Sequence, residues 1–403
     1  MNRIFETRNK KRETRNQKPN YELTYLMKIL LNILALTLLT TTIWAQEVVV
    51  ADSTAATADS TVQVVAQAEE PEIILPEALL YDVDSMLNDY NARQYLKAFD
   101  CDTSDISGEV SDSIYVERLS RLPRLMEMVY NDVVRKVIDK YTGRLRPTVS
   151  FLLGSANFYF PIFEEILEKE GLPLELKYLP AIESALRPQA TSRAGAAGLW
   201  QFMVPTAKQY GLKVNSIVDE RRDPFKSTYA AARYLKALYR IYGDWNLVIA
   251  AYNCGPGNVN KAIRRANGSR DYWEIYPYLP LETRGYVPAF IGANYVMNYY
   301  CEHKICPMRT ELPIQCDTVM TNHNVSLKQI AEFCGIDLKY LRALNPQYRQ
   351  DLVPGNTELS AICLPLKEMT IFIDNEDAIY KYKADEYLYR RRIVHPRGRG
   401  NGR

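Results

Sequence analysis

The residue in this chain best suited to chemistry is a single carboxylate in an apolar run. Glu183 follows Leu179, Ala181 and Ile182 and precedes Ala185. Burial of a carboxylate without partners is costly, and an apolar setting raises its pKa. A carboxyl group with a raised pKa can act as a general acid near neutral pH. The sequence therefore predicts an acid catalyst at Glu183.

Three further elements follow Glu183 along the chain. A Gly/Ala-rich turn, Gly195 to Gly198, leads into Leu199-Trp200-Gln201, and small residues there let backbone approach a bulky partner. The other two are Ala251-Tyr252-Asn253-Cys254-Gly255 and Glu282-Thr283-Arg284-Gly285-Tyr286-Val287. Taken singly, each has a structural explanation: the tyrosines suit a core with a wet hydroxyl, and Gln201 suits a helix cap. Their order between residues 178 and 287 favours a shared site.

This order of elements resembles the soluble lytic transglycosylases, lysozyme-like enzymes that cut peptidoglycan. The nearest likeness is to the membrane-bound lytic transglycosylase D type, which carries LysM modules after its catalytic domain. The resemblance implies a mainly α lysozyme-like domain followed by a small α+β module. It implies Glu183 as the single acid/base, peptidoglycan glycan strands as the partner, and neither a metal nor an organic cofactor.

The resemblance also implies a set of substrate-binding residues. Trp200 stands where the family generally has Met, and both stacking on a sugar ring and packing in the core remain open for it. In the family the tyrosine matched by Tyr286 reaches the acid and helps to orient it. The implied substrate-binding positions are Ser192, Gly198, Trp200, Gln201, Tyr252, Asn253, Glu282 and Tyr286.

The implied reaction needs one enzyme carboxylate. Most glycosidases use two, whereas in this family the glutamate first protonates the glycosidic oxygen and then takes the proton from the 6-hydroxyl of N-acetylmuramic acid. The 2-acetamido group stabilises the cationic carbon, and the 6-hydroxyl closes a 1,6-anhydro ring. An intramolecular nucleophile has a large proximity advantage, so a second carboxylate is dispensable.

Two other functions are alternatives. A hydrolase of the goose-lysozyme kind needs a positioned water and a second carboxylate, for which Asp219, Glu220 and Asp223 are the nearby downstream acids, Asp223 being better explained as a helix cap. A non-catalytic peptidoglycan-binding protein would use only the LysM-like module. The mass of released products separates the first two functions, because hydrolysis adds a water.

Charge and targeting signals indicate an exported protein. Residues 28–45 have the positive start, apolar core and small final residue of a signal peptide, so we expect a periplasmic or cell-envelope location, with membrane association only if the signal is uncleaved. Met1 and Met27 are both candidate starts. Beyond residue 45 the chain has 42 Lys+Arg and 45 Asp+Glu, which does not favour a nucleic-acid binder.

The sequence divides into six segments. An N-terminal extension and signal peptide occupy 1–45, a linker 46–75, a helical lead-in 76–150 and the lysozyme-like domain 151–305. A LysM-like module follows at 315–366, and 367–403 is a charged, Tyr-rich segment with a basic tail. The usual Gly-Asp before the first helix of such a module is here His323-Asn324, so its sugar binding is left open.

Local signals predict the helices that position the site. We expect one from Phe160 to Lys169, one opened by Pro173 that carries Glu183, and one opened by Asp223-Pro224 and ended by Gly243. Asp244 should cap the next helix, which ends before Gly255. A last helix at 282–300 contains Pro288, which should kink it or mark its true first turn.

The seven cysteines do not have the spacing of a zinc site. There is no CxxC motif with partner histidines, and the three histidines are His303, His323 and His395. Export makes disulfides permissible, and Cys301 and Cys306 are close enough in sequence to pair if the chain turns between them. Their odd number leaves at least one thiol free or paired between molecules.

Overall fold

The computed structural model describes residues 73–80, 110–122, 125–310, 312 and 316–388. The expected signal peptide, almost all of the linker and the basic tail lie outside these residues. None of the helices it describes is long and apolar enough to cross a membrane. The described residues form two hydrophobic cores: a helical one that runs from Leu75 to Ile305, and a second one formed chiefly by residues between Val319 and Ile379.

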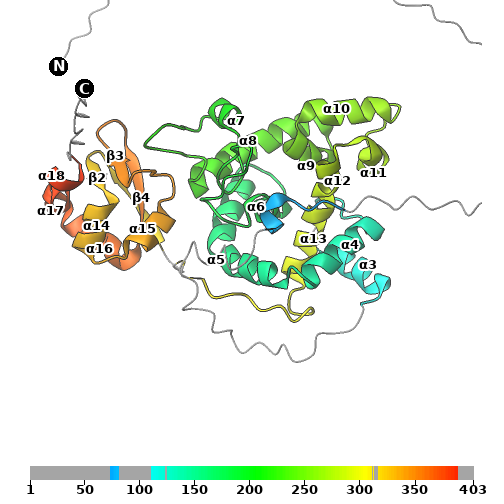
Figure 1. Ribbon diagram of the computed structural model, residues 1–403, viewed down its shortest axis with the longest axis horizontal. Helices are drawn as coiled ribbons and strands as arrows, with labels where there is room; N and C mark the ends of the chain where they lie inside the picture. The colour runs from blue at the N-terminus through cyan, green and yellow to red at the C-terminus, as the bar shows by residue number, and fades with distance from the viewer. Residues whose placement is uncertain (1–72, 81–109, 123–124, 311, 313–315, 389–403) are drawn as a thin grey trace, which may run out of the picture. The chain divides into compact units, whose positions relative to one another are not determined.

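The regular elements that contribute to the first core are all helices, as the fold class predicted (Figure 1). Its elements, in chain order, are η1 (Glu77–Leu80), α3 (Asp112–Arg121), α4 (Asp132–Thr142), α5 (Arg146–Lys169), η3 (Leu174–Tyr178), α6 (Leu179–Ser184), α7 (Val204–Gln209), α8 (Pro224–Tyr242), α9 (Trp245–Cys254), α10 (Pro256–Arg265), α11 (Tyr272–Ile275), η4 (Tyr276–Tyr278), α12 (Leu281–Arg284) and α13 (Tyr286–Asn298).

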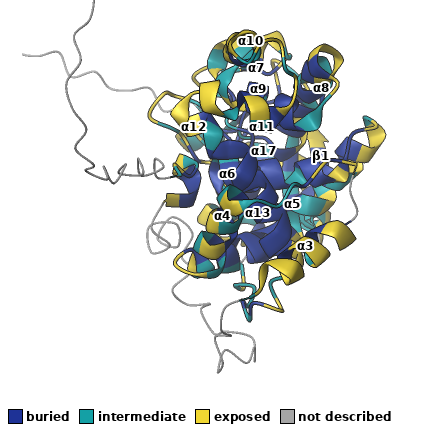
Figure 2. Cartoon of the chain, turned by 90° about the vertical axis from the view of Figure 1, so that its right-hand side faces the viewer, coloured by how far each residue is buried: buried dark blue, intermediate teal, exposed yellow. Residues whose placement is uncertain are grey.

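Helix α13 is the centre of this core. All of its residues from Tyr286 to Met297 are buried, and Figure 2 shows it in dark blue among helices with exposed outer faces. A helix that is apolar all round must be enclosed by neighbours, and α4, α9, α6 and α5 pack against it. Because Tyr286 stands in its first turn, the most enclosed helix of the domain carries a site residue.

Helix boundaries were predicted well where capping residues mark them. The side chain of Asp223 accepts hydrogen bonds from the backbone N–H groups of Phe225 and Lys226, both at 2.9 Å, at the start of α8. Gly243 ends α8 with a φ of 66°, and Asp244 caps α9 through the N–H of Leu247 at 2.8 Å. These three signals are confirmed because each acts within one turn.

Boundaries without such signals were less well predicted. Helix α5 begins at Arg146 rather than near Phe160, so the expected division at residue 150 falls inside a helix. The expected lead-in, 76–150, is also part of the first core. Val134, Val137 and Ile138 on α4 are 0% exposed and belong to that core. Pro288 does not kink a longer helix. It lies in the first turn of α13, which follows a break at Gly285, and this was the second of the two predicted alternatives.

The second core belongs to the α+β module. Strand β1 (Cys316–Thr321) pairs antiparallel with β4 (Ser360–Pro365), with Val319 opposite Ile362, and β2 (Asn324–Ser326) pairs antiparallel with β3 (Leu352–Pro354). The remaining elements are α14 (Leu327–Cys334), α15 (Leu338–Leu344), α16 (Leu366–Asp374), α17 (Glu376–Lys381) and α18 (Ala384–Tyr387).

The module does not end at residue 366. Phe372 on α16 and Ile379 on α17 are 1% and 0% exposed and belong to its core. The Gln329 side-chain amide donates to the carbonyl of Tyr382 at 2.7 Å. The sequence did not indicate this extension, because these short helices present only one large buried residue each among charged neighbours.

Candidate active site

Glu183 stands at the end of a short helix that turns sharply after it. The predicted single helix is a 3-10 turn, η3, followed by the six-residue α6. Ala185 and Leu186 then adopt positive φ angles of 50° and 57°, which is costly for residues with a side chain. Ser184 holds this turn, since its hydroxyl lies within hydrogen-bond distance of the carbonyls of Pro180 at 3.0 Å and Leu199 at 2.9 Å.

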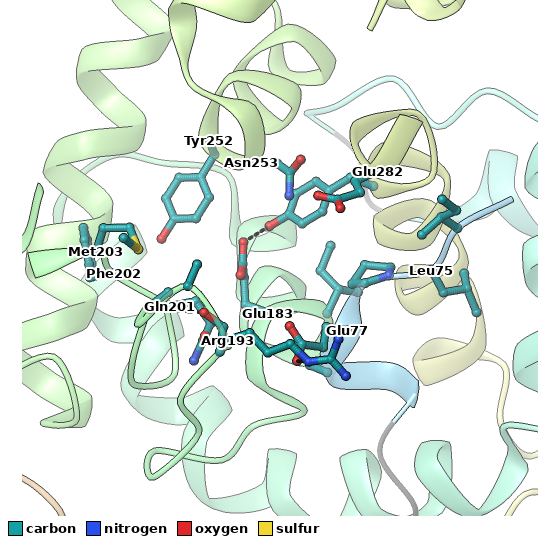
Figure 3. A pocket seen from close by; sticks show the side chains of 18 of the residues that line it. Leu75, Glu77, Glu183, Arg193, Gln201, Phe202, Met203, Tyr252, Asn253 and Glu282 are labelled. Carbon is teal, nitrogen blue, oxygen red and sulfur yellow. Dashed lines mark hydrogen bonds and ion pairs between the residues drawn. The ribbon is translucent and has the colours of Figure 1, made fainter. Parts of the chain in front are cut away.

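The environment of Glu183 gives it the titration behaviour of a general acid. Burial raises the pKa of Glu183 to about 7, and the hydrogen bond from Tyr286 opposes that rise without cancelling it. The Tyr286 hydroxyl donates to Oε1 of Glu183 (Figure 3). Burial and the nearby Glu183 carboxylate keep the pKa of Tyr286 well above 10, so this hydroxyl stays a donor at neutral pH.

A cleft of about 930 Å³ opens beside Glu183. Seven of the nine predicted site residues line it, and Gly198 and Trp200 are the two that do not. Figure 3 shows the cleft with Glu183 at its centre, the α9 residues on one side and residues of η1 on another. The predicted residues that line it are Glu183, Ser192, Gln201, Tyr252, Asn253, Glu282 and Tyr286.

Tyr252 and Asn253, at the end of α9, join the parts of the site together. The Tyr252 hydroxyl donates to the carbonyl of Trp200 at 2.7 Å, and burial keeps the pKa of Tyr252 well above 10. The Thr283 hydroxyl donates to Oδ1 of Asn253 at 2.8 Å, which ties α9 to α12. The amide nitrogen of Asn253 is then on the side of the cleft that faces Glu183 (Figure 3).

Ser192 and Gln201 brace the loop that follows Glu183. The Ser192 hydroxyl accepts a hydrogen bond from the N–H of Ala196 at 3.1 Å, within a tight turn. The side-chain amide of Gln201 donates to the carbonyls of Gly198 at 2.8 Å and Ala190 at 3.3 Å. Both side chains line the cleft and also hold the loop in place. Gln201 therefore does not cap a helix, which was the structural alternative for it.

The prediction that Trp200 binds substrate is wrong for this structure. Its side chain is 0% exposed, its indole N–H donates to the Thr228 hydroxyl at 2.8 Å, and its ring packs edge-on against Phe163. Of the two alternatives, Trp200 packs in the core. A fully enclosed ring cannot stack on a sugar.

Gly198 is also not a substrate-binding residue. It is buried, with a φ of 88°, and a Cβ built on it would lie 1.7 Å from the carbonyl oxygen of Arg221. Glycine is required here by close backbone approach. The small residues of this turn therefore allow close contact with the protein's own backbone at Arg221, and not with a ligand.

The acids proposed for a second carboxylate have structural roles. Asp219 forms an ion pair with Arg221 at 2.8 Å, Glu220 pairs with Lys226 at 2.6 Å, and Asp223 caps α8. None of them lines the cleft. The carboxylates that line it together with Glu183 are Glu77 and Glu282.

Sequence reasoning missed one wall of the cleft. Residues of the segment Ile73–Leu80, together with Arg193 and Met203, line it beside Glu183. In the sequence only the short apolar run at residues 73–75, at the end of the expected linker, marks this segment. Among the described residues no cluster of His, Cys, Asp or Glu could hold a metal ion.

Cys301 and Cys306, which are close enough in sequence to pair, do not form a disulfide with each other. Cys306 is disulfide-bonded, whereas Cys301 carries a free thiol.

Two family models match the chain. Residues 160–275 match the Transglycosylase SLT domain, and residues 315–381 match the LysM-like domain of the lytic transglycosylase MltD. The second match ends at residue 381, in agreement with the extended core of the module. The expected combination of a lysozyme-like helical domain and a small LysM-like module is confirmed.

The chain is similar to proteins from several bacteria. The chain is 34% identical over 219 residues to the membrane-bound lytic murein transglycosylase D of Escherichia coli strain K12, covering 53% of this chain and 48% of that protein. It is 27% identical over 208 residues to the membrane-bound lytic murein transglycosylase F of Hahella chejuensis, covering 46% and 39%. The chain therefore spans about half or less of the length of these relatives.

A solved structure with a similar region is the 70 kDa soluble lytic transglycosylase of Escherichia coli. It is 28% identical, covers 35% of this chain and 24% of that chain, and has a TM-score of 0.31.

Proposed function

We propose that this chain, which carries a transglycosylase SLT domain and a LysM-like domain, is a peptidoglycan lytic transglycosylase. It cleaves the β-1,4 bond between N-acetylmuramic acid and N-acetylglucosamine and forms 1,6-anhydro-N-acetylmuramic acid. The observation that carries the proposal is a half-buried Glu183, with a pKa of about 7, that accepts a hydrogen bond from Tyr286 inside a cleft.

Glu183 acts in two successive steps. A carboxyl group with a pKa near the working pH is protonated in a large fraction of molecules and gives its proton to the glycosidic oxygen as the bond breaks. The resulting carboxylate then takes the proton of the 6-hydroxyl, whose oxygen bonds to the anomeric carbon. The Tyr286 hydroxyl donates to the carboxylate and holds it in place.

A cell-envelope location accords with this substrate. The relatives named above are described as membrane-bound murein transglycosylases, and residues 28–45 have the pattern of an export signal. We propose that the protein acts in the periplasm in remodelling or turnover of the wall.

The test is mass spectrometry of fragments released from purified sacculi. We expect fragments that end in 1,6-anhydro-N-acetylmuramic acid, and we expect Glu183→Gln to lower the rate by at least about 100-fold because the acid is lost. Glu274→Gln, an exposed glutamate away from the cleft, is the matched control and should keep full activity.

Other products would change the assignment. Reducing-end fragments, one water heavier, would make the protein a hydrolase of the goose-lysozyme kind. Sacculus binding without release would leave a peptidoglycan-binding protein. Full activity of Glu183→Gln would remove Glu183 from the mechanism.

A further inference from the structure

One wall of the cleft comes from a part of the chain far from the other site residues. Ile73–Leu80 precedes Glu183 by more than 100 residues and lies outside the region that matches the SLT domain. Six of its residues nevertheless line the cleft with Glu183: Ile74, Leu75, Pro76, Glu77, Ala78 and Leu80. Figure 3 shows Glu77 near Glu183, and Leu75 farther along the same wall of the cleft.

The segment is held firmly against the helical core. Leu75, Ala78 and Leu79 are 4%, 5% and 0% exposed, and η1 packs against α6, the helix that carries Glu183. The ammonium group of Lys140 donates to the carbonyl of Ile73 at 3.0 Å. Burial of these apolar side chains against the core therefore holds the segment in place at the edge of the cleft.

Gly285 makes the close approach of this segment feasible. A Cβ built on Gly285 would lie 1.9 Å from the carbonyl oxygen of Ile74. The glycine separates α12, which carries Glu282, from α13, which begins with Tyr286. The segment thus packs at the junction between two cleft-lining residues.

The cleft-facing side chains of the segment suit a sugar. Leu80 is 56% and Ile74 39% exposed, although both are large and apolar, and both line the cleft. A pyranose ring has an apolar face of C–H groups and a rim of hydroxyl donors. Glu77 supplies a carboxylate acceptor at the same wall, 3.9 Å from the Arg193 guanidinium on the opposite loop.

We propose that Ile73–Leu80 is a substrate-binding wall of the active-site cleft. Leu80 packs against the apolar face of a sugar unit, and Glu77 accepts hydrogen bonds from hydroxyl or acetamido N–H groups of an N-acetylated glycan. The choice of glycan as ligand depends on the proposed function.

The first test separates KM from kcat for release from sacculi. Leu80→Ser should raise KM about 5-fold, and the near-isosteric Glu77→Gln about 3- to 10-fold, with kcat and the melting temperature unchanged. Ile241→Ser is the matched control, since Ile241 is 52% exposed and does not line the cleft. If the KM is unchanged in both cleft variants and the wild type releases fragments normally, Ile73–Leu80 does not bind substrate. The proposed function would then still stand.

The second test does not need catalysis. Leu80 is replaced by the photoreactive residue p-benzoylphenylalanine, and the protein is irradiated with a tetramer of N-acetylglucosamine. We expect a cross-link at position 80 and none when the same replacement is made at Ile241. Absence of a cross-link at position 80 would show that Ile73–Leu80 does not bind the glycan, whether or not the protein is active. Absence of fragment release, by contrast, would contradict only the proposed function.

Discussion

At the scale of single residues, the site depends on the balance between burial of Glu183 and one hydrogen bond to it. Burial favours the protonated carboxyl group and raises its pKa to about 7, whereas the Tyr286 hydroxyl favours the carboxylate. The two effects suit a group that must give a proton and then accept one.

The pH dependence of activity should report this balance. Glu183 must be protonated to begin the reaction, so kcat/KM of the wild type should fall as pH rises through about 7. Tyr286→Phe removes the hydroxyl that stabilises the carboxylate, so the pKa of Glu183 should rise and this fall should move to higher pH, with a lower kcat. A profile that stays in place or moves to lower pH would contradict the role given to Tyr286.

Trp200 provides a second prediction at this scale. Trp200→Phe removes buried ring area and the hydrogen bond to Thr228, and should lower the free energy of unfolding by about 1–3 kcal/mol. The KM should not change, because the ring does not reach the cleft. Urea unfolding and steady-state kinetics on the same variant check both statements; a raised KM with normal stability would restore the stacking role.

At the scale of elements, the turn after α6 and the loop from Ala190 to Phe202 position the acid. Ser184 lies within hydrogen-bond distance of Leu199, Gln201 ties the loop to itself, and Tyr252 connects it to α9. Gly198 allows this loop to approach the backbone of Arg221. Hydrogen bonds to α6, to α9 and within the loop therefore hold it in place.

Glycine substitutions in this loop test its packing. Gly198→Ala places a Cβ against the carbonyl of Arg221 at an unfavourable φ, and should destabilise the protein by about 3–5 kcal/mol. Gly195→Ala is the control, because it has a similar φ of 86° but nothing within 4 Å, and should cost only about 1 kcal/mol. Equal melting temperatures for the two variants would contradict the close approach.

At the scale of the whole molecule, each of the two cores includes residues beyond the expected domain limits. The helical core takes in η1, α3 and α4 before the region that matches the SLT domain. The core of the LysM-like module takes in α16 and α17 after residue 366.

Shortening the chain tests the extended module. A chain that ends after Pro365 lacks Phe372 and Ile379. Burial of each of these side chains contributes about 1.5–3 kcal/mol to the free energy of unfolding, which is a large share of the stability of so small a module. Scanning calorimetry should then show no separate unfolding of the module, whereas a chain ended after Leu388 should unfold like the full chain. Identical calorimetric traces for the two shortened chains would show that the module ends near residue 366, as predicted from the sequence.

The sequence by itself determined the elements whose signals act over a few residues. Asp223, Asp244 and Gly243 marked helix ends because caps are local, and Glu183 was singled out because a carboxylate among apolar neighbours is unusual wherever the chain folds. The order of the site elements predicted that residues from Ser192 to Tyr286 would meet around it.

Only the tertiary structure decided which of those residues face the cleft. Trp200 and Gln201 are neighbours in sequence, yet one is enclosed in the core and the other lines the cleft, because the path of the loop sets their directions. Ile73–Leu80 reaches Glu183 through packing against α6, a contact across more than 100 residues that no local pattern encodes. Long-range packing determines such contacts, and it depends on the whole core at once.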